Sequence, residues 1–378
     1  MSGEHSILPP SGAAKWRRCA MWPTMNRRFP KADTPETLEG NAAHWVAWEM
    51  YAGRHVEAGT FAPNGVVVTP EMIEGAELLY EVIAERINPG RAIVERRVSC
   101  NAVHEMCWGT PDVRAELTSN FVLEVIDYKY GHRFVDEYEN DQCVVYTSGI
   151  LDEIATQLNY PVGELDRVVT VNITIVQPRC FYKGKPVRTW SVRAVDLRAQ
   201  INALSNAARE ALGPNPRATP HPDTCRDCPG RAACPELQKA AYSDAQTGYA
   251  CSPVELTPAA ASLELKMLEA ALGRLQSRVE GLREVVAAYA RQGHATPWYR
   301  IEKTYGRQEW TIPPGQVIAL GQLMGKDLQR VACCTPKQAA KIGIDETVIT
   351  DYSITPSGAP KLVPDNPADA RRVFGRTF

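Results

Sequence analysis

The amino-acid sequence predicts an α/β or α+β fold with a mixed central sheet flanked by helices. Residues 38–87 show the apolar spacing of two helices, and residues 92–130 change to the alternating pattern of three strands. Residues 140–195 then predict one more helix and two more strands. Helices and strands that alternate along a chain in this way pack as layers around one core.

The composition excludes several classes of protein. The chain has 378 residues, 44% of them hydrophobic and 23% charged, so it can bury a full core and carry an appendage. A formal net charge of −2 excludes a uniformly basic nucleic-acid coat. The sequence contains no apolar run of the roughly 20 residues that cross a bilayer, and residues 1–12 lack the apolar segment of a secretory signal. We therefore expect a cytoplasmic protein with no membrane partner.

The helices and strands are expected in the following order. The first helix, from about Leu38 to Tyr51, places Gly40, His44 and Trp48 on one face because they are four residues apart. A second helix is expected from about Pro70 to Ile87, after a loop marked by glycine and proline. The expected strands lie at residues 92–100, 110–117, 121–130, 168–178 and 189–195, with a helix at 140–158 between the third and the fourth.

Three parts of the chain are expected: a core domain in residues 1–250, a long helix in 251–294 and a small mixed segment of unassigned role in 295–378. Thr257 and Pro258 have the residue types of an N-cap and a first helical position. Apolar residues then recur in steps of three and four, as in a heptad pattern. Such a seam needs a partner helix, which is either another part of the folded chain or a second copy.

Two carboxylates face one another in the expected hairpin. A turn at residues 118–120 pairs residues whose numbers sum to about 239, which places Asp112 opposite Asp127. Lys129 lies two residues beyond Asp127 and projects from the same face. Opposed carboxylates repel unless a cation lies between them, and Mg²⁺ and Mn²⁺ prefer such oxygen ligands. A solvated hairpin face with alternating charges is the alternative interpretation.

Two anions, an ammonium group and a divalent ion suit phosphodiester hydrolysis. The metal polarises a phosphoryl oxygen and lowers the pKa of bound water. A nearby lysine orients that water and offsets the charge that develops on phosphorus. We therefore predict catalytic roles for Asp112, Asp127 and Lys129.

The cysteines predict a second metal site. Cys225, Cys228 and Cys234 lie within ten residues, a spacing that lets one loop wrap a soft metal. A tetrahedral site needs a fourth ligand, for which Cys19 is the candidate.

The first 31 residues are locally basic, with six Lys or Arg against one acidic residue. Arg17 and Arg18 belong to this stretch. It is either a solvated face or an arm that contacts nucleic-acid phosphates.

Several motifs follow one another in an informative order. They are E-G-N-A-A-H at residues 39–44, V-E-R-R-V at 94–98, G-T-P-D at 109–112, V-I-D-Y-K-Y-G at 125–131 and N-D-Q-C-V-V-Y at 140–146. This order resembles the PD-(D/E)xK nucleases of the RecB-like branch over most of residues 11–240. The resemblance implies a restriction-endonuclease-like core. It also implies that His44 joins the acidic pair as a metal ligand, and that Gln142 and Tyr146 line a DNA channel beside the metal.

The cysteine arrangement carries a resemblance of its own. One cysteine before the core and three after it are similar to the iron–sulfur nucleases related to the AddB subunit and to CRISPR spacer-acquisition nucleases. The resemblance implies a [4Fe–4S] cluster held by Cys19, Cys225, Cys228 and Cys234. Zn²⁺ is the alternative, because four thiolates suit either metal. Either metal would join the two ends of the core by closing a loop of about two hundred residues.

The chain is also similar to a group of phage- and prophage-encoded RecB-like nucleases. The shared motifs include S-G-A-A-K-W-R-R-C at residues 11–19, T-I-V-Q-P-R at 174–179 and G-A-P-K-L-V-P at 358–364. Two departures concern local geometry. The usual proline and glycine are missing after Cys19, and Asp141 precedes Gln142 where proline is usual.

Together the resemblances imply a Mg²⁺- or Mn²⁺-dependent DNA exonuclease that leaves 5′-phosphates and serves phage recombination, replication or repair. The Tyr128 carbonyl is expected as a further ligand, and Glu95 as a supporting residue. Expected partners are DNA ends, a phage single-strand-binding or annealing protein, and further copies of the chain. The alternatives are an endonuclease, and a non-catalytic DNA-binding or assembly scaffold that keeps the fold.

Overall fold

The computed structural model describes residues 6–30, 33–87, 89–180, 185–246, 257–299, 301 and 319. The helices in this part of the chain are α1 (Ala13–Arg18), α2 (Trp22–Arg28), α3 (Pro35–Tyr51), α4 (Pro70–Arg86), α5 (Asp141–Gln157), α6 (Val162–Val168), α7 (Ala194–Ala211), α8 (Pro222–Arg226), α9 (Pro235–Gln246) and α10 (Pro258–Arg291). The strands are β1 (Ala92–Val94), β2 (Val98–Ser99), β3 (Trp108–Gly109), β4 (Val113–Ala115), β5 (Val122–Tyr128), β6 (Thr170–Val176) and β7 (Val187–Arg193).

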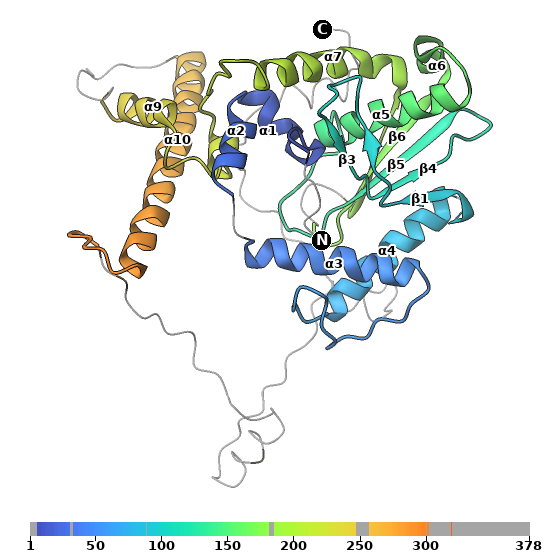
Figure 1. Cartoon of the computed structure of the whole chain (residues 1–378), viewed down its shortest axis with the longest axis horizontal. Coiled ribbons are helices and arrows are strands. Elements are labelled where there is room, and N and C mark those ends of the chain that lie inside the picture. Colours follow the sequence, from blue (N-terminus) through green and yellow to red (C-terminus); the bar gives the residue numbers. More distant parts are fainter. Residues whose placement is uncertain are drawn as a thin grey trace. The chain divides into compact units, whose positions relative to one another are not determined.

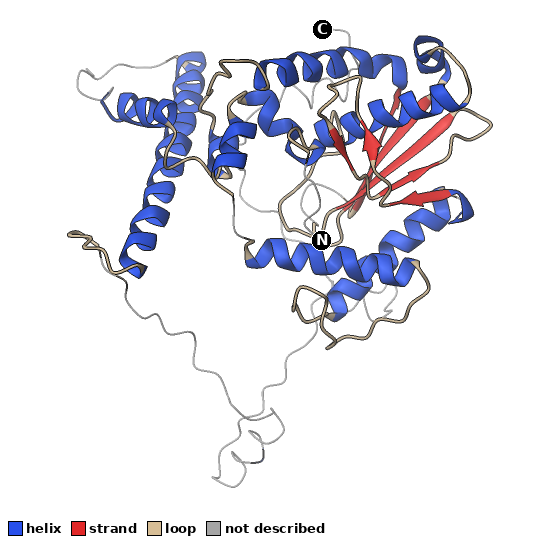
Figure 2. Cartoon of the chain, in the orientation of Figure 1, coloured by secondary structure: helices blue, strands red, loops and turns tan. Residues whose placement is uncertain are grey.

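Five strands form a mixed sheet in the order β1-β4-β5-β6-β7 (Figures 1 and 2). Strands β5 and β6 are parallel, and the other neighbours are antiparallel. Parallel strands need a long crossover connection, which here contains α5 and α6. The predicted mixed fold, with helices flanking a central sheet, is confirmed.

The two faces of the sheet are buried under different helices (Figure 1). Leu123 and Val125 of β5 belong to a core shared with α5 and α7. Ile126 and Tyr128 of the same strand belong to a second core, shared with α3 and α4. Alternate side chains of β5 therefore enter opposite cores, as the period of two requires.

The predicted register of the β4–β5 hairpin is confirmed. Val113 pairs with Ile126 and Arg114 with Val125, so the paired numbers sum to 239. The same register places Asp112 opposite Asp127.

The prediction of one continuous strand at residues 92–100 is wrong. The chain forms β1, which pairs with β4, and β2, which pairs with β3 in a separate two-stranded sheet. Glu95 separates them with φ at 49°, in the left-handed region that extended strands do not use.

The long helix α10 begins where the sequence predicts, and the Thr257 hydroxyl accepts a hydrogen bond from the Ala260 N–H. It packs through small residues: a Cβ at Gly273 would lie 2.6 Å from Pro222, and one at Gly281 would lie 2.8 Å from Arg231. The leucines of the predicted seam at 265, 268, 272 and 282 are exposed in the described part of the chain.

One compact unit spans residues 1–288 as far as the structure describes them, and it holds the sheet with its helices. Most of residues 295–378, including Cys333 and Cys334, lie outside the described residues. Among the described helices, none combines the length and apolar character needed to cross a bilayer.

Gly149 tests the packing of α5 on the small sheet. A Cβ at this position would lie 2.4 Å from the Ser99 carbonyl oxygen and 2.6 Å from Val98 Cγ1. We expect Gly149→Ala to lower the free energy of unfolding in urea by about 1–3 kcal/mol, because backbone cannot yield cheaply. Gly163→Ala in α6 is the control. The added Cβ would meet no atom within 4 Å, so this substitution should raise the free energy of unfolding by about 0.4–1 kcal/mol. Equal effects of the two substitutions would contradict this packing.

Candidate metal centre

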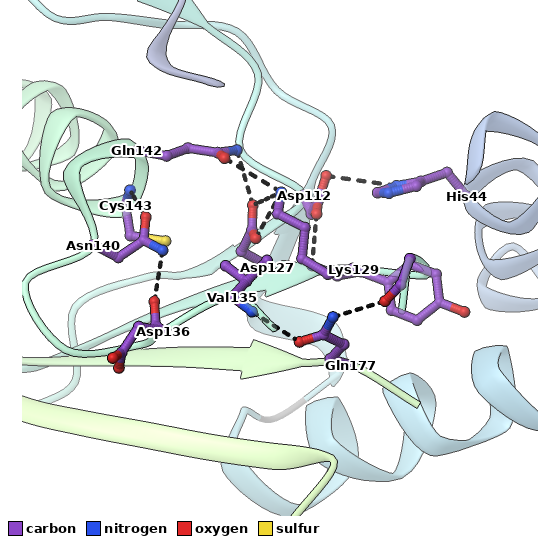
Figure 3. A network of polar contacts seen from close by, with 12 residues as sticks. His44, Asp112, Asp127, Lys129, Val135, Asp136, Asn140, Gln142, Cys143 and Gln177 are labelled. Carbon is purple, nitrogen blue, oxygen red and sulfur yellow. Dashed lines mark hydrogen bonds and ion pairs between the residues drawn. The ribbon is translucent and has the colours of Figure 1, made fainter. Parts of the chain in front are cut away.

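The candidate site lies where β4 and β5 meet (Figure 3). Asp112 directly precedes β4, and its Oδ2 accepts a hydrogen bond of 2.7 Å from the Tyr128 N–H. Asp127 belongs to β5, and the Lys129 ammonium lies 2.8 Å from its Oδ2 and 2.9 Å from its Oδ1. The predicted convergence of Asp112, Asp127 and Lys129 at one end of the hairpin therefore matches the geometry.

His44 and Glu95 bring two more ligand atoms to this place. His44 Nδ1 is 3.7 Å from Asp112 Oδ1, and the His44 ring meets the Tyr128 ring edge-on with centroids 5.2 Å apart. One ligand atom from each of His44, Glu95 and Asp112 lies within 4.8 Å of the others. A nitrogen and two carboxylate oxygens at this spacing can hold a divalent metal ion.

Glu95 contributes more directly than its expected supporting role. Its N–H donates to the Asp112 carbonyl oxygen at 3.1 Å, so the two backbones are fixed side by side. The left-handed φ of Glu95 is uncommon for a residue with a side chain, and such strain persists only where the surroundings impose it. The acidic residue in V-E-R-R-V was the available sequence signal, but the expected strand placed it in regular β-structure.

Burial and neighbouring charges shift the pKa values of the site residues. Burial raises the pKa of Asp127, and the nearby Asp112 raises it further. Desolvation and the Asp112 charge likewise raise the pKa of Glu95. Burial alone would lower the pKa of Lys129, but the carboxylates of Asp127 and Asp112 raise it above its usual value. Lys129 is therefore a stable ammonium group that offsets the charge of Asp127, the carboxylate it contacts.

Gln142 and Tyr146 lie beside the buried ion pair. Gln142 Nε2 donates to Asp127 Oδ1 at 2.9 Å, and its Oε1 accepts from the Lys129 ammonium at 3.3 Å (Figure 3). Tyr146, one helical turn further along α5, hydrogen-bonds to Gln142. Gln142 thus orients both Asp127 on β5 and Lys129 directly after it.

Gln177 holds the connection between β5 and α5, a role that the sequence did not indicate. Its buried side chain donates to the carbonyls of Gly131 and Arg133 at 2.7 Å each and accepts from the Val135 N–H at 3.2 Å. Asn140 then caps α5 by accepting from the Cys143 N–H. The partners of Gln177 are backbone groups of a distant segment, which residue spacing cannot reveal.

The remaining predicted residues have simpler surroundings. Arg17 pairs with Asp141 at 2.6 Å, and Arg18 pairs with Asp223 at 3.0 Å. Tyr128 donates its N–H to Asp112, and a ligand role for its carbonyl stays a prediction.

The four predicted cysteines line one small pocket. Cys19 at the end of α1 lines it together with Cys225, Cys228 and Cys234. The Thr219 N–H lies 3.5 Å from the Cys19 sulfur. The pKa values of Cys225 and Cys228 are raised to about 11, first by burial and then by the other sulfurs. Thiolates are ligands of both zinc and iron–sulfur clusters, and a metal held by these four cysteines stays a prediction.

A known protein family matches nearly the whole chain. Residues 5–371 match the model of a family described as "Protein of unknown function (DUF2800)". The chain belongs to this family. Both the carboxylate site and the cysteine pocket of this DUF2800 protein lie inside the matched region.

Metal binding to the DUF2800 protein can be measured without any activity. We expect Mn²⁺ to raise the melting temperature of the full chain, because a ligand of the folded state stabilises it by about 2.7 kcal/mol at 100 times its Kd. Asp112→Asn and Glu95→Gln should each raise that Kd at least about tenfold. Glu116→Gln, at an exposed acidic residue directly after β4, should leave the Kd for Mn²⁺ unchanged. A parental Mn²⁺ response in Asp112→Asn would contradict the site.

The cysteine pocket predicts a bound metal in protein purified without oxygen. We expect iron or zinc by elemental analysis, with broad absorption near 400 nm if the metal is an iron–sulfur cluster. Cys225→Ser should lose the metal and lower the melting temperature, because metal binding contributes to folding. Cys180→Ser, a buried cysteine outside this pocket, should retain the metal. Equal metal content in the two variants would refute the assignment.

Proposed function

We propose that this protein is a Mg²⁺- or Mn²⁺-dependent deoxyribonuclease that hydrolyses phosphodiester bonds at DNA ends. The observation that carries the proposal is the meeting of His44, Glu95 and Asp112 ligand atoms within 4.8 Å, beside the Asp127–Lys129 ion pair. Hard oxygen donors, one imidazole and an adjacent ammonium group are the residue types that phosphoryl transfer requires.

The metal would be held by His44, Glu95 and Asp112, with Asp127 close by. When bound, such an ion polarises a phosphoryl oxygen and makes water a better nucleophile at neutral pH. His44 and Asp112 are half-buried and Glu95 is exposed. The Tyr128 N–H holds the Asp112 carboxylate, and the Glu95 N–H holds the two backbones side by side. Preorganised ligands of this kind lose little entropy when the ion binds.

Lys129 is the residue of this chain that would act on the reacting phosphate. Asp127 and Gln142 fix its ammonium group at 2.8 Å and 3.3 Å. A fixed cation stabilises the negative charge that grows on the phosphoryl oxygens and can orient the attacking water. Attack on the phosphorus with departure of the 3′-oxygen leaves a 5′-phosphate on the product.

The finer parts of the proposal rest on the motif resemblances. They support an exonuclease in phage recombination, replication or repair, with DNA ends and a phage single-strand-binding or annealing protein as partners. They also support a [4Fe–4S] cluster in the cysteine pocket, with zinc as the alternative. The cluster would act as a structural staple between α1 and the segment that contains α8.

Cleavage of end-labelled linear DNA with Mg²⁺ tests the proposal. We expect Lys129→Ala to lower kcat by about 10²–10³-fold, because a fixed charge facing the reacting group is lost. Lys239→Ala, an exposed lysine on α9, should cut like the parent.

Three outcomes separate the alternatives. Cutting of covalently closed circles would show an endonuclease. DNA binding with no divalent-dependent cleavage would favour the non-catalytic scaffold. Parental activity in Lys129→Ala would refute the catalytic role of Lys129.

A further inference from the structure

A cleft of about 880 Å³ opens beside the candidate metal centre. Its walls come from residues 6–11, α2, β3 and α5. Thr110 lines the cleft and lies two residues before Asp112. Tyr146 also lines it, and hydrogen-bonds to the Gln142 side chain that donates to Asp127. Tyr146 and Gln142 therefore connect the cleft to Asp127.

Two indole rings form part of this cleft, and both are held in place. Trp108 is half-buried, and the Arg97 guanidinium lies 3.6 Å from its ring centroid. Trp22 is buried, and a Cβ at Gly12 would lie only 2.8 Å from its ring. Rings with fixed positions are suitable platforms for another flat ring to stack on.

The charge of the cleft favours an anionic ligand. Among the described residues that line it, the only charged side chain is Arg27. Two further cations stand over the indoles, Arg97 at Trp108 and Lys15 at Trp22, the latter 5.6 Å from the ring centroid. Stacking platforms combined with positive charge are how proteins bind single-stranded nucleic acids. The volume falls in the range of roughly 300–1,000 Å³ that encloses a small organic ligand.

We propose that this cleft binds an unpaired nucleotide of the DNA strand, next to the bond that is cleaved, with its base stacked on Trp108. The inference rests on the proposed nuclease function and goes beyond it by naming the substrate form and the side chain that selects it. A base inside a duplex is paired and stacked, so it cannot enter a protein cleft without leaving the helix. The preferred substrate is therefore a single strand or a frayed end.

Binding without cleavage tests the cleft. Fluorescence anisotropy with a labelled 12-nucleotide oligodeoxythymidylate, and Ca²⁺ in place of Mg²⁺, gives the Kd of the full chain. We expect Trp108→Ala to raise Kd about tenfold, because stacking on an aromatic ring strengthens binding by about 1–3 kcal/mol per base. Trp108→Phe should keep most of the affinity. Phe61→Ala, an exposed aromatic that does not line this cleft, should bind like the parent.

An abasic site moved along the oligonucleotide identifies the stacked base. At one position the losses from Trp108→Ala and from the missing base should not add, because each removes the same contact. Additive losses at every position would overturn the inference, as would parental affinity in a Trp108→Ala variant that melts like the parent. Failure of the two proposals is distinguishable. A parent that cuts DNA while Trp108→Ala binds normally refutes the cleft alone, whereas a parent that neither binds nor cuts DNA refutes both.

Discussion

The pairing of β4 with β5 is the constraint on which the candidate site depends. A slip of one residue would turn Asp112 and Asp127 toward opposite faces of the sheet. Two features hold the register: Val113 pairs with Ile126 and Arg114 with Val125, and the Tyr128 N–H is bound to the Asp112 carboxylate. The same strand sends alternate side chains into two separate cores, so any slip would also expose apolar surface. The position of the carboxylates is therefore maintained by the stability of the whole sheet.

The sequence predicted the parts of this arrangement that follow from local periodicity. Asp112, Asp127 and Lys129 were placed by a turn and a period of two, and the structure has that register. Glu95 was expected only as support, because a φ of 49° interrupts the strand in a way that residue spacing does not record. The resemblance, rather than any spacing, pointed to His44. The sequence analysis did not predict helix α7, although apolar residues recur along it at helical spacing. The expected strand at residues 189–195 overlaps the first turn of this helix.

Residues 17–22 contact both predicted sites. Cys19 lines the cysteine pocket, Trp22 lines the cleft, and Arg17 pairs with Asp141 directly before Gln142. Helix α1 also contacts α5 and α7, so it is part of the main core. A metal in the cysteine pocket would fix the end of α1 and the start of α2. The proposed staple and the proposed substrate cleft would then form one structural unit, which would explain why a nuclease retains a metal that takes no part in the chemistry.

Charge balance is the argument for a divalent ion in the proposed metal centre. Asp112 lies with Glu95 and His44, and its charge also acts on Asp127. Lys129 is bound to Asp127 through both carboxylate oxygens. The ammonium offsets one negative charge and leaves two, apart from His44. A monovalent cation would leave a net charge in a partly buried place, which is costly. A divalent ion would match the two remaining carboxylates in charge, and Mg²⁺ or Mn²⁺ would accept their oxygens as ligands. The same imbalance makes the metal-free site a source of instability, since carboxylates that repel one another remain only where the fold holds them together.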